Sequence, residues 1–196
     1  MAIGRPREFD TDEALERAQK VFCAKGYDAA SIAELTKAMG ISSPSLYAAF
    51  ESKEGLFRAV LDHYGQQRVQ YLEEALNAPT ARETVKRVLE TAARLYSEDK
   101  DQASWLVMRG GVACGCEAIA DDLSKRRERI ELALRDRFQK AADEGEFSGR
   151  EVNPTALARY VLSVLTGMGI QAASGAGRAE LEEIAGIATS SFPAGA

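Results

Sequence analysis

Helix-start signals recur along the chain, and they constrain its fold more than any other sequence feature. In each of three places a capping residue is followed three positions later by glutamate, and in a fourth an asparagine precedes proline. These signals are Asp10 with Glu13, Ser31 with Glu34, Thr80 with Glu83, and Asn153 with Pro154. Alternating runs of β-branched and aromatic residues between Asn-Gly or Asp-Gly turns are absent from the sequence. We therefore predict an all-α protein of about nine helices.

The expected helices form two groups. Three short helices occupy about the first fifty residues, and a long fourth helix begins at Ser52-Lys53. The expected bounds of the three are Asp10 to Gly26, Ser31 to Gly40, and Ser43 to Phe50 with Pro44 at the first helical position. We predict an N-terminal three-helix domain over residues 1–52 and a larger C-terminal helical domain over residues 53–196, linked by the fourth helix.

The C-terminal part contains one segment that could be mistaken for a membrane span. Tyr160 to Gly177 carries no charge, but its serines, threonine, glutamine and four glycines make it too polar for a lipid-facing helix. We interpret it as a helix covered by protein on most sides. A long amphipathic helix is expected from Glu117 to Glu144, a short one from Arg178 to Ser190, and a frayed tail from Ser191 to Ala196.

Composition narrows the class of protein. The chain of 196 residues is 45% hydrophobic and 28% charged, which is typical of a soluble globular protein that needs no disulfide or metal to fold. Its net charge of −5 excludes a protein that binds polyanions over its whole surface, so any nucleic-acid site must be local. Three cysteines without framework spacing suggest thiols in a reducing cytosol, and the N-terminus is not a signal peptide. We expect a cytoplasmic protein without a membrane partner.

Residues 31–50 have the pattern of a helix-turn-helix. Leu35, Met39, Ile41 and Leu46 are placed where two helices must touch, and Gly40 can adopt the positive φ of a sharp turn. The second helix of such a unit enters the major groove of DNA. Its base-facing residues would be Ser43, Pro44, Ser45 and Ala48.

The stretch "SIAELTKAMGISSPSLYAAFESKEGLF", together with Phe22 and Lys25-Gly26-Tyr27, resembles the N-terminal domain of the TetR family of bacterial transcriptional regulators. The resemblance covers about the first third of the chain. It implies a repressor that binds double-stranded operator DNA as a homodimer and is released by a small-molecule effector. It also implies that Tyr47 and Lys53 contact phosphates, and that Ser31, Lys37, Ser43 and Ser45 touch backbone or bases. Ala48 and Ala49 depart from the family pattern, in which histidine or another aromatic residue often precedes the phenylalanine.

The charge of the N-terminal part of the chain is balanced, so DNA binding must depend on where its charges lie. Residues 1–60 contain eight basic and nine acidic side chains, a net charge of −1. We expect Lys37 and Lys53 on the DNA side, with Arg5 and Arg7 either in an arm that enters the minor groove or in a solvated tail.

Functional predictions for the C-terminal domain are less specific. Some of its apolar side chains could line an effector cavity or merely fill the core; these are Tyr96, Trp105, Met108, Cys114, Phe138 and Met168. The family resemblance makes the helix from Asn153 to Ser174, with the last helix, half of a four-helix dimer interface.

The cysteines and the single histidine raise the question of functions other than effector-controlled DNA binding. Cys114 and Cys116 could act as a thiol or metal sensor, or could permit close helix packing. The one histidine, His63, is expected at a surface or inter-domain position, and no residues suggest an enzyme, a resident metal or a cofactor. A DNA-binding or adaptor protein of the same fold without a small-molecule effector is the remaining alternative.

Overall fold

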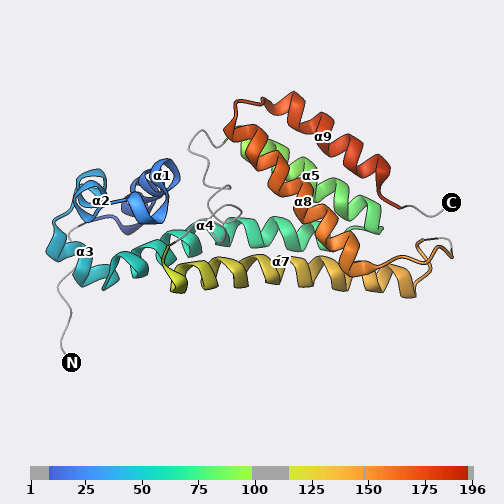
Figure 1. Cartoon of the computed structure of the whole chain (residues 1–196), viewed down its shortest axis with the longest axis horizontal. Helices are drawn as coiled ribbons and strands as arrows, with labels where there is room; N and C mark the ends of the chain where they lie inside the picture. The colour runs from blue at the N-terminus through green and yellow to red at the C-terminus, as the bar shows by residue number, and fades with distance from the viewer. Residues whose placement is uncertain (1–8, 99–114, 148, 194–196) are drawn as a thin grey trace. The chain divides into compact units, whose positions relative to one another are not determined.

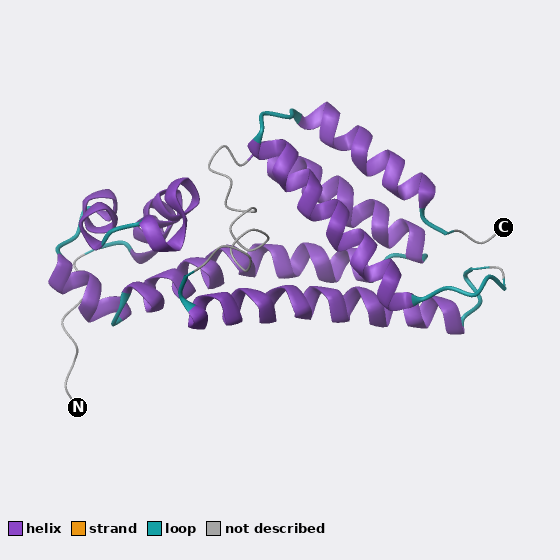
Figure 2. Cartoon of the chain, viewed as in Figure 1, coloured by secondary structure: helices purple, strands orange, loops and turns teal. Residues whose placement is uncertain are grey.

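The structure, a computed structural model, describes residues 9–98, 115–147 and 149–193. All regular secondary structure in these ranges is helical, which confirms the all-α prediction (Figure 2). The helices are α1 (Thr11–Ala29), α2 (Ile32–Met39), α3 (Ser43–Phe50), α4 (Lys53–Leu76), α5 (Ala81–Glu98), α7 (Glu117–Asp143), α8 (Pro154–Ala173) and α9 (Arg178–Ser191) (Figure 1).

The chain divides into two compact units, residues 1–66 and residues 67–196, which we call the N-terminal and the C-terminal unit. The division lies inside α4, the helix that the sequence predicted to link the two domains. A continuous helix gives the sequence no turn or change of composition by which such a division could be located.

The N-terminal unit is built around a small aromatic core. Helix α1 packs against α2, and α2 packs against α3. Phe22 of α1 and Phe57 of α4 are fully buried and meet edge to face with ring centroids 4.9 Å apart, and Tyr27 lies 5.2 Å from Phe57. Burial of each large apolar side chain stabilises the unit by about 1.5–3 kcal/mol. The first three helices are therefore held to the start of α4.

Helix α1 begins where the sequence predicted but ends later than predicted. The Asp10 carboxylate accepts the backbone N–H groups of Asp12 at 2.9 Å and Glu13 at 3.2 Å. The backbone leaves the helical conformation at Gly26, with φ 76° and ψ 175°, and one more turn follows as far as Ala29. The sequence predicted that the helix ends at Gly26; the glycine interrupts the helix, but the helical segment continues to Ala29.

The core of the C-terminal unit joins four helices. Helix α5 packs against α9 and α8, and α7 packs against α8 (Figure 1). Buried side chains of this core include Leu89, Leu134, Phe138, Val161, Met168, Leu181 and Phe192. Phe192 corrects the prediction of a frayed tail, because its ring lies 5.1 Å from that of Phe138 and only 1% of its surface is exposed. A large aromatic residue directly after α9 was a signal that the core extends beyond that helix.

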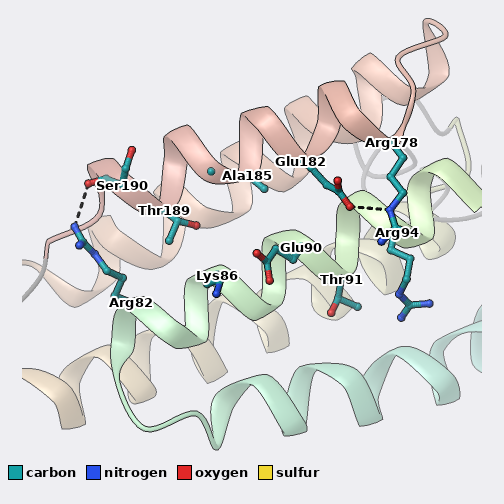
Figure 3. A pocket seen from close by; sticks show the side chains of 11 residues that line it. Arg82, Lys86, Glu90, Thr91, Arg94, Arg178, Glu182, Ala185, Thr189 and Ser190 are labelled. Carbon is teal, nitrogen blue, oxygen red and sulfur yellow. Dashed lines mark hydrogen bonds and ion pairs between the residues drawn. The ribbon is translucent and has the colours of Figure 1, made fainter.

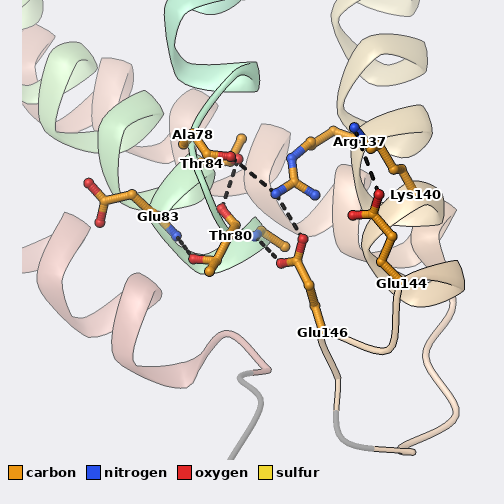
Figure 4. A network of polar contacts seen from close by, with 9 residues as sticks. Ala78, Thr80, Glu83, Thr84, Arg137, Lys140, Glu144 and Glu146 are labelled. Atoms are coloured by element: carbon orange, nitrogen blue, oxygen red, sulfur yellow. Dashed lines mark hydrogen bonds and ion pairs between the residues drawn. The ribbon is translucent and has the colours of Figure 1, made fainter.

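A partly buried ion pair ties three segments of the C-terminal unit together (Figure 4). Arg137 of α7 donates to Glu146 at 3.0 Å and to the carbonyl of Ala78 at 3.3 Å. The second carboxylate oxygen of Glu146 accepts the N–H of Ala81, the first residue of α5, at 2.5 Å. Glu146 therefore satisfies a helix N-terminus and a guanidinium at once.

Helix α8 is long and apolar enough to cross a membrane, a test that the core helix of a soluble protein also passes. Its Asn153 cap and Pro154 start are confirmed, because the Asn153 side chain accepts the N–H of Ala156 at 3.0 Å. Among the described residues of the C-terminal unit, one side of the helix is buried, through Ala158, Val161 and Leu165. The prediction that protein covers most of its sides includes a partner helix and stays a prediction.

Candidate nucleic-acid interface

The turn between α2 and α3 has the geometry that the sequence predicted. Ser31 and Glu34 form a reciprocal capping box at the start of α2, with Ser31 Oγ accepting the Glu34 N–H at 3.2 Å. At the other end Gly40 adopts φ 71° and ψ 27°, a left-handed conformation that glycine adopts at little cost. The N–H of Ile41 donates to the Thr36 carbonyl at 3.1 Å, which fixes the direction in which the chain enters α3.

The N-cap of α3 lies one residue before the predicted cap. Ser42, not Ser43, is the N-cap, and its hydroxyl oxygen accepts the N–H of Ser45 at 3.2 Å. Pro44 therefore occupies the second helical position, where it also replaces an N–H that has no partner within the helix. Because two consecutive serines precede Pro44, the sequence alone does not show which of them is the N-cap.

The eight residues of α3 separate into two faces. Leu46 and Phe50, one turn apart, are buried against the rest of the N-terminal unit. Ser43, Pro44, Tyr47 and Ala48 are exposed, and Tyr47 is 48% accessible, which is unusual for an aromatic side chain. We call these four residues the outward face of α3. Ser45 is half-buried, with its Oγ 2.8 Å from that of Ser42.

The junction between α3 and α4 is tight and strained. Glu51 has φ 66° and ψ −40°, and the Ser52 N–H donates back to the Phe50 carbonyl at 2.7 Å. A Cβ atom on Gly55 would lie 2.0 Å from the Phe50 carbonyl oxygen, so glycine permits this close approach. Glu51 and Gly55 set the end of α3 but were missed in the sequence, because neither belongs to a recognisable turn pair.

Two lysines assigned to the interface have different surroundings. Lys37 is exposed and has no hydrogen bond or ion pair within the described residues. Lys53 is half-buried: its Nζ donates to the Asp28 carbonyl at 3.2 Å and lies 4.5 Å from the centroid of the Tyr27 ring. A phosphate at Lys53 would have to share an ammonium group that already holds α4 to the end of α1.

Charge pairing reinforces the start of α2. Lys25 of α1 forms an ion pair with Glu34. This contact, followed by the hydrogen bonds from Ser31, lowers the pKa of Glu34 to about 2. Glu34 therefore stays ionised to a lower pH than an ordinary glutamate, and the Ser31 hydroxyl, which donates to it at 2.8 Å, is already engaged in the cap.

The remaining predicted residues are distributed as follows. Arg5, Arg7, Trp105, Met108 and Cys114 lie outside the described residues. Tyr96, Phe138 and Met168 are brought together in the core of the C-terminal unit, and Cys116 is half-buried directly before α7. Within the described ranges no three His, Cys, Asp or Glu side chains could hold a metal ion. His63 lies 3.6 Å from the Asp12 carboxylate inside the N-terminal unit.

Comparisons with known proteins agree with this geometry. The model of the family described as bacterial regulatory proteins, tetR family, matches residues 14–60. The transcriptional repressor ComR of Escherichia coli (strain K12) is 31% identical over 97% of this chain and 92% of its own. The repressor BdcR of the same strain is 42% identical over 55% of each chain.

A solved structure extends the likeness to the whole fold. A cysteine mutant of the TetR family regulator CifR, in complex with a 26-base-pair operator duplex, is 38% identical to this chain. It superposes with a TM-score of 0.87 over 96% of this chain and all of its own. A match of this extent covers both units and includes a protein bound to DNA. The chain therefore belongs to the TetR family and is a helix-turn-helix DNA-binding transcriptional regulator.

Proposed function

We propose that the protein is a cytoplasmic repressor that binds a near-palindromic operator as a homodimer and is released by a small-molecule effector. The observation that carries the DNA-contacting part of this proposal is the outward face of α3. Its exposed Tyr47 and the small residues Ser43, Pro44 and Ala48 stand on a helix fixed by two caps and a left-handed glycine. A helix so placed can enter a major groove with its N-terminal residues nearest the bases.

The outward face suggests a division of roles. Ser43, Pro44 and Ala48 would approach base edges, while Tyr47 and Lys37 would contact phosphates. Ser31, Ser45 and Lys53 stay in the proposed interface, where DNA must compete with the bonds that these side chains already make. Arg5 and Arg7 would extend the interface into the adjacent minor groove.

The exposed sides of α8 and α9 support the homodimer. Ile170 of α8 is 46% accessible and Ile187 of α9 is 68% accessible. From Tyr160 to its end α8 carries no charged side chain, and small residues such as Gly167 allow a partner helix to approach closely. Burial of the exposed apolar side chains against that partner removes them from water, which is favourable. A two-fold dimer would present two copies of α3 about 34 Å apart, the length of one turn of DNA.

An effector would act through the C-terminal unit. Its core side chains Tyr96, Phe138 and Met168, with Trp105, Met108 and Cys114, are the proposed lining of the effector site. Binding would favour a conformation in which the two recognition helices no longer match successive major grooves. Coupling of about 1–3 kcal/mol suffices, because it changes operator affinity by about 5-fold to 150-fold. A tight ligand that leaves operator affinity unchanged would contradict this part of the proposal.

Selection of duplexes from random-sequence DNA tests the DNA part. We expect a near-palindromic consensus. The dependence of binding on salt should be modest: a plot of the logarithm of the binding constant against the logarithm of the salt concentration should have a slope of about −0.9 per phosphate neutralised. Lys37→Gln should lower the salt slope by about one for each recognition helix, while Lys20→Gln on α1 should leave it unchanged. Selected sites without two-fold symmetry would argue against the dimer. Equal salt slopes for Lys37→Gln and Lys20→Gln would argue against a phosphate contact by Lys37.

Sedimentation measures the dimer directly. Ile187→Glu places a charge on the proposed interface and should shift the protein toward the monomer. Leu132→Glu provides the matched control, because Leu132 of α7 is also exposed, at 38%, but lies outside α8 and α9. Equal dissociation by the two variants, or by neither, would contradict the proposed interface.

A further inference from the structure

A hollow of about 610 Å³ lies between α5 and α9 in the C-terminal unit, away from the core residues proposed for the effector (Figure 3). Side chains one turn apart along α5 line one wall, and α9 supplies the other. The charged residues that line it are Arg82, Lys86, Glu90, Arg94, Arg178 and Glu182. Four cations therefore face two carboxylates.

The two ends of the hollow differ in how these charges are matched. At one end Arg178 is paired with Glu182 at 2.7 Å, and Arg94 contacts Glu98 at 3.4 Å. At the other end stand Arg82 and Lys86, one helical turn apart, which corresponds to a rise of about 6 Å. Lys86 is exposed and has no acceptor or carboxylate partner within the described residues. The positive charge in excess is thus at the Arg82 end.

Arg82 is held in place, but only one of its nitrogens donates to an acceptor among the described residues. Its Nη2 donates to the carbonyls of Ser190 at 3.0 Å and Phe192 at 2.9 Å, which fixes the guanidinium across the end of α9. Both bonds use the same nitrogen, so the other N–H groups have no acceptor in the part of the chain that the structure describes. A guanidinium carries five donors in a fixed fork, and a single oxyanion can accept two of them.

Thr189 adds a third donor without an acceptor. Its Oγ1 is one of two buried side-chain polar atoms without a hydrogen-bond partner among the described residues. Thr84 and Thr166, by contrast, donate to the carbonyl one turn earlier, at 3.0 and 2.8 Å. Figure 3 shows Thr189 on the side of α9 that faces α5, across from Lys86. Thr189 itself is half-buried, so a rotation about χ1 can bring the hydroxyl to the hollow.

We propose that Arg82, Lys86 and Thr189 form a binding site for a compact oxyanion, a phosphate or carboxylate group of a small molecule. An oxyanion offers only acceptors, and this end of the hollow offers donors without acceptors from two helices. Glu90, one turn beyond Lys86, forms no ion pair among the described residues and repels an anion, which confines the site to the Arg82 end. A bound anion ties α5 to the end of α9.

The test is a titration of the full-length ¹⁵N-labelled protein with inorganic phosphate, and separately with acetate, replacing chloride at constant ionic strength. Saturable amide shifts at Lys86 and Thr189 with either anion are expected, and the tighter of the two identifies the preferred oxyanion. Shifts that rise linearly without saturation for both anions, or that are confined to the N-terminal unit, would overturn the site.

Four variants sharpen the result. Lys86→Gln should weaken binding at least about fivefold, as expected for loss of one charge-assisted hydrogen bond, and Thr189→Val should weaken it by a smaller factor. Glu90→Gln should tighten binding, because it removes a repelling charge. Lys125→Gln is the matched control, since Lys125 is an exposed lysine of α7, paired with Asp121, and should change nothing. Equal anion affinity in Lys86→Gln and Lys125→Gln would show that the anion is held by nonspecific electrostatic attraction and not by this site.

Discussion

The two units of this protein specify their structure in different ways. In the N-terminal unit, short helices are set by neighbours in sequence: Ser31 with Glu34, Ser42 with Ser45, and Gly40 at a turn. In the C-terminal unit, residues far apart in sequence carry the structure, as Phe138 with Phe192 and Arg137 with Glu146 show. A DNA-reading unit needs its helices at fixed angles, and local caps provide this in few residues. A body that can host ligands depends on a larger core.

The largest expected effect comes from the C-terminal core. Phe138→Ala removes a fully buried ring that packs on Phe192, and should lower the free energy of unfolding by about 3–5 kcal/mol. Leu132→Ala, on the same helix but 38% exposed, should cost less than about 1 kcal/mol. Urea denaturation followed by circular dichroism measures both. A similar small cost for the two substitutions would mean that long-range packing does not hold this unit.

The Arg137–Glu146 pair ranks next. Glu146→Gln leaves a guanidinium that is only 9% exposed without its counter-charge, while the amide can still accept the Ala81 N–H. We expect a loss of about 2–3 kcal/mol, less than for a fully buried pair. The control is Glu144→Gln, whose exposed carboxylate lies 3.9 Å from Lys140 and should matter by less than about 0.5 kcal/mol. If thermal denaturation gives the same Tm for Glu146→Gln and Glu144→Gln, the Arg137–Glu146 pair does not stabilise the unit as we expect.

A pair of glycines in α4 tests the N-terminal unit. Gly55→Ala places a methyl group against the Phe50 carbonyl and should destabilise the α3–α4 junction by about 1–3 kcal/mol. The same change at Gly65, where a Cβ meets nothing within 4 Å, should stabilise the helix by about 0.5–1 kcal/mol. We therefore predict that the two substitutions change stability in opposite directions, measured as shifts of the denaturation midpoint. If both substitutions stabilise, the junction is not as tight as the structure indicates.

The smallest effect is a dependence on pH. The pKa of Glu34 is lowered to about 2 from 4.5, chiefly by Lys25, so its contribution to stability is complete above pH 4.5 and is lost as the pH falls toward 2. Lys25→Met should flatten this part of the stability profile. Lys37→Met removes an exposed lysine without a partner in the described residues and should leave the profile of the wild type. Parallel profiles for Lys25→Met and the wild type would refute the assignment.

The extent to which the sequence predicts the molecule follows the same division. The caps at Asp10, Ser31 and Asn153 and the turn at Gly40 could be predicted, because each is settled by side chains within four residues. Burial of Phe192 could not, because its partner Phe138 is far away in the chain. The same holds for Glu146, which caps α5 from a loop beyond α7.

The interface shows a similar limit. The outward face of α3 follows from helical spacing once Leu46 and Phe50 are taken as buried. The engagement of Lys53 with Asp28 and Tyr27 does not, because it depends on how α4 meets the end of α1. Sequence spacing thus indicates which face a residue occupies, but not whether its polar group is already used.

The most direct test of the central claim compares two exposed tyrosines, one in each unit. Tyr47 is 48% and Tyr71 is 37% accessible, so replacement of either by alanine should leave the fold intact, as circular dichroism can verify. Operator affinity is then measured by fluorescence anisotropy on a duplex recovered by selection. We predict that Tyr47→Ala weakens binding about tenfold or more, the equivalent of about 1.4 kcal/mol, while Tyr71→Ala binds as the wild type does. Unchanged affinity in Tyr47→Ala, or an equal loss in both variants, would contradict the assignment of the outward face of α3 to DNA.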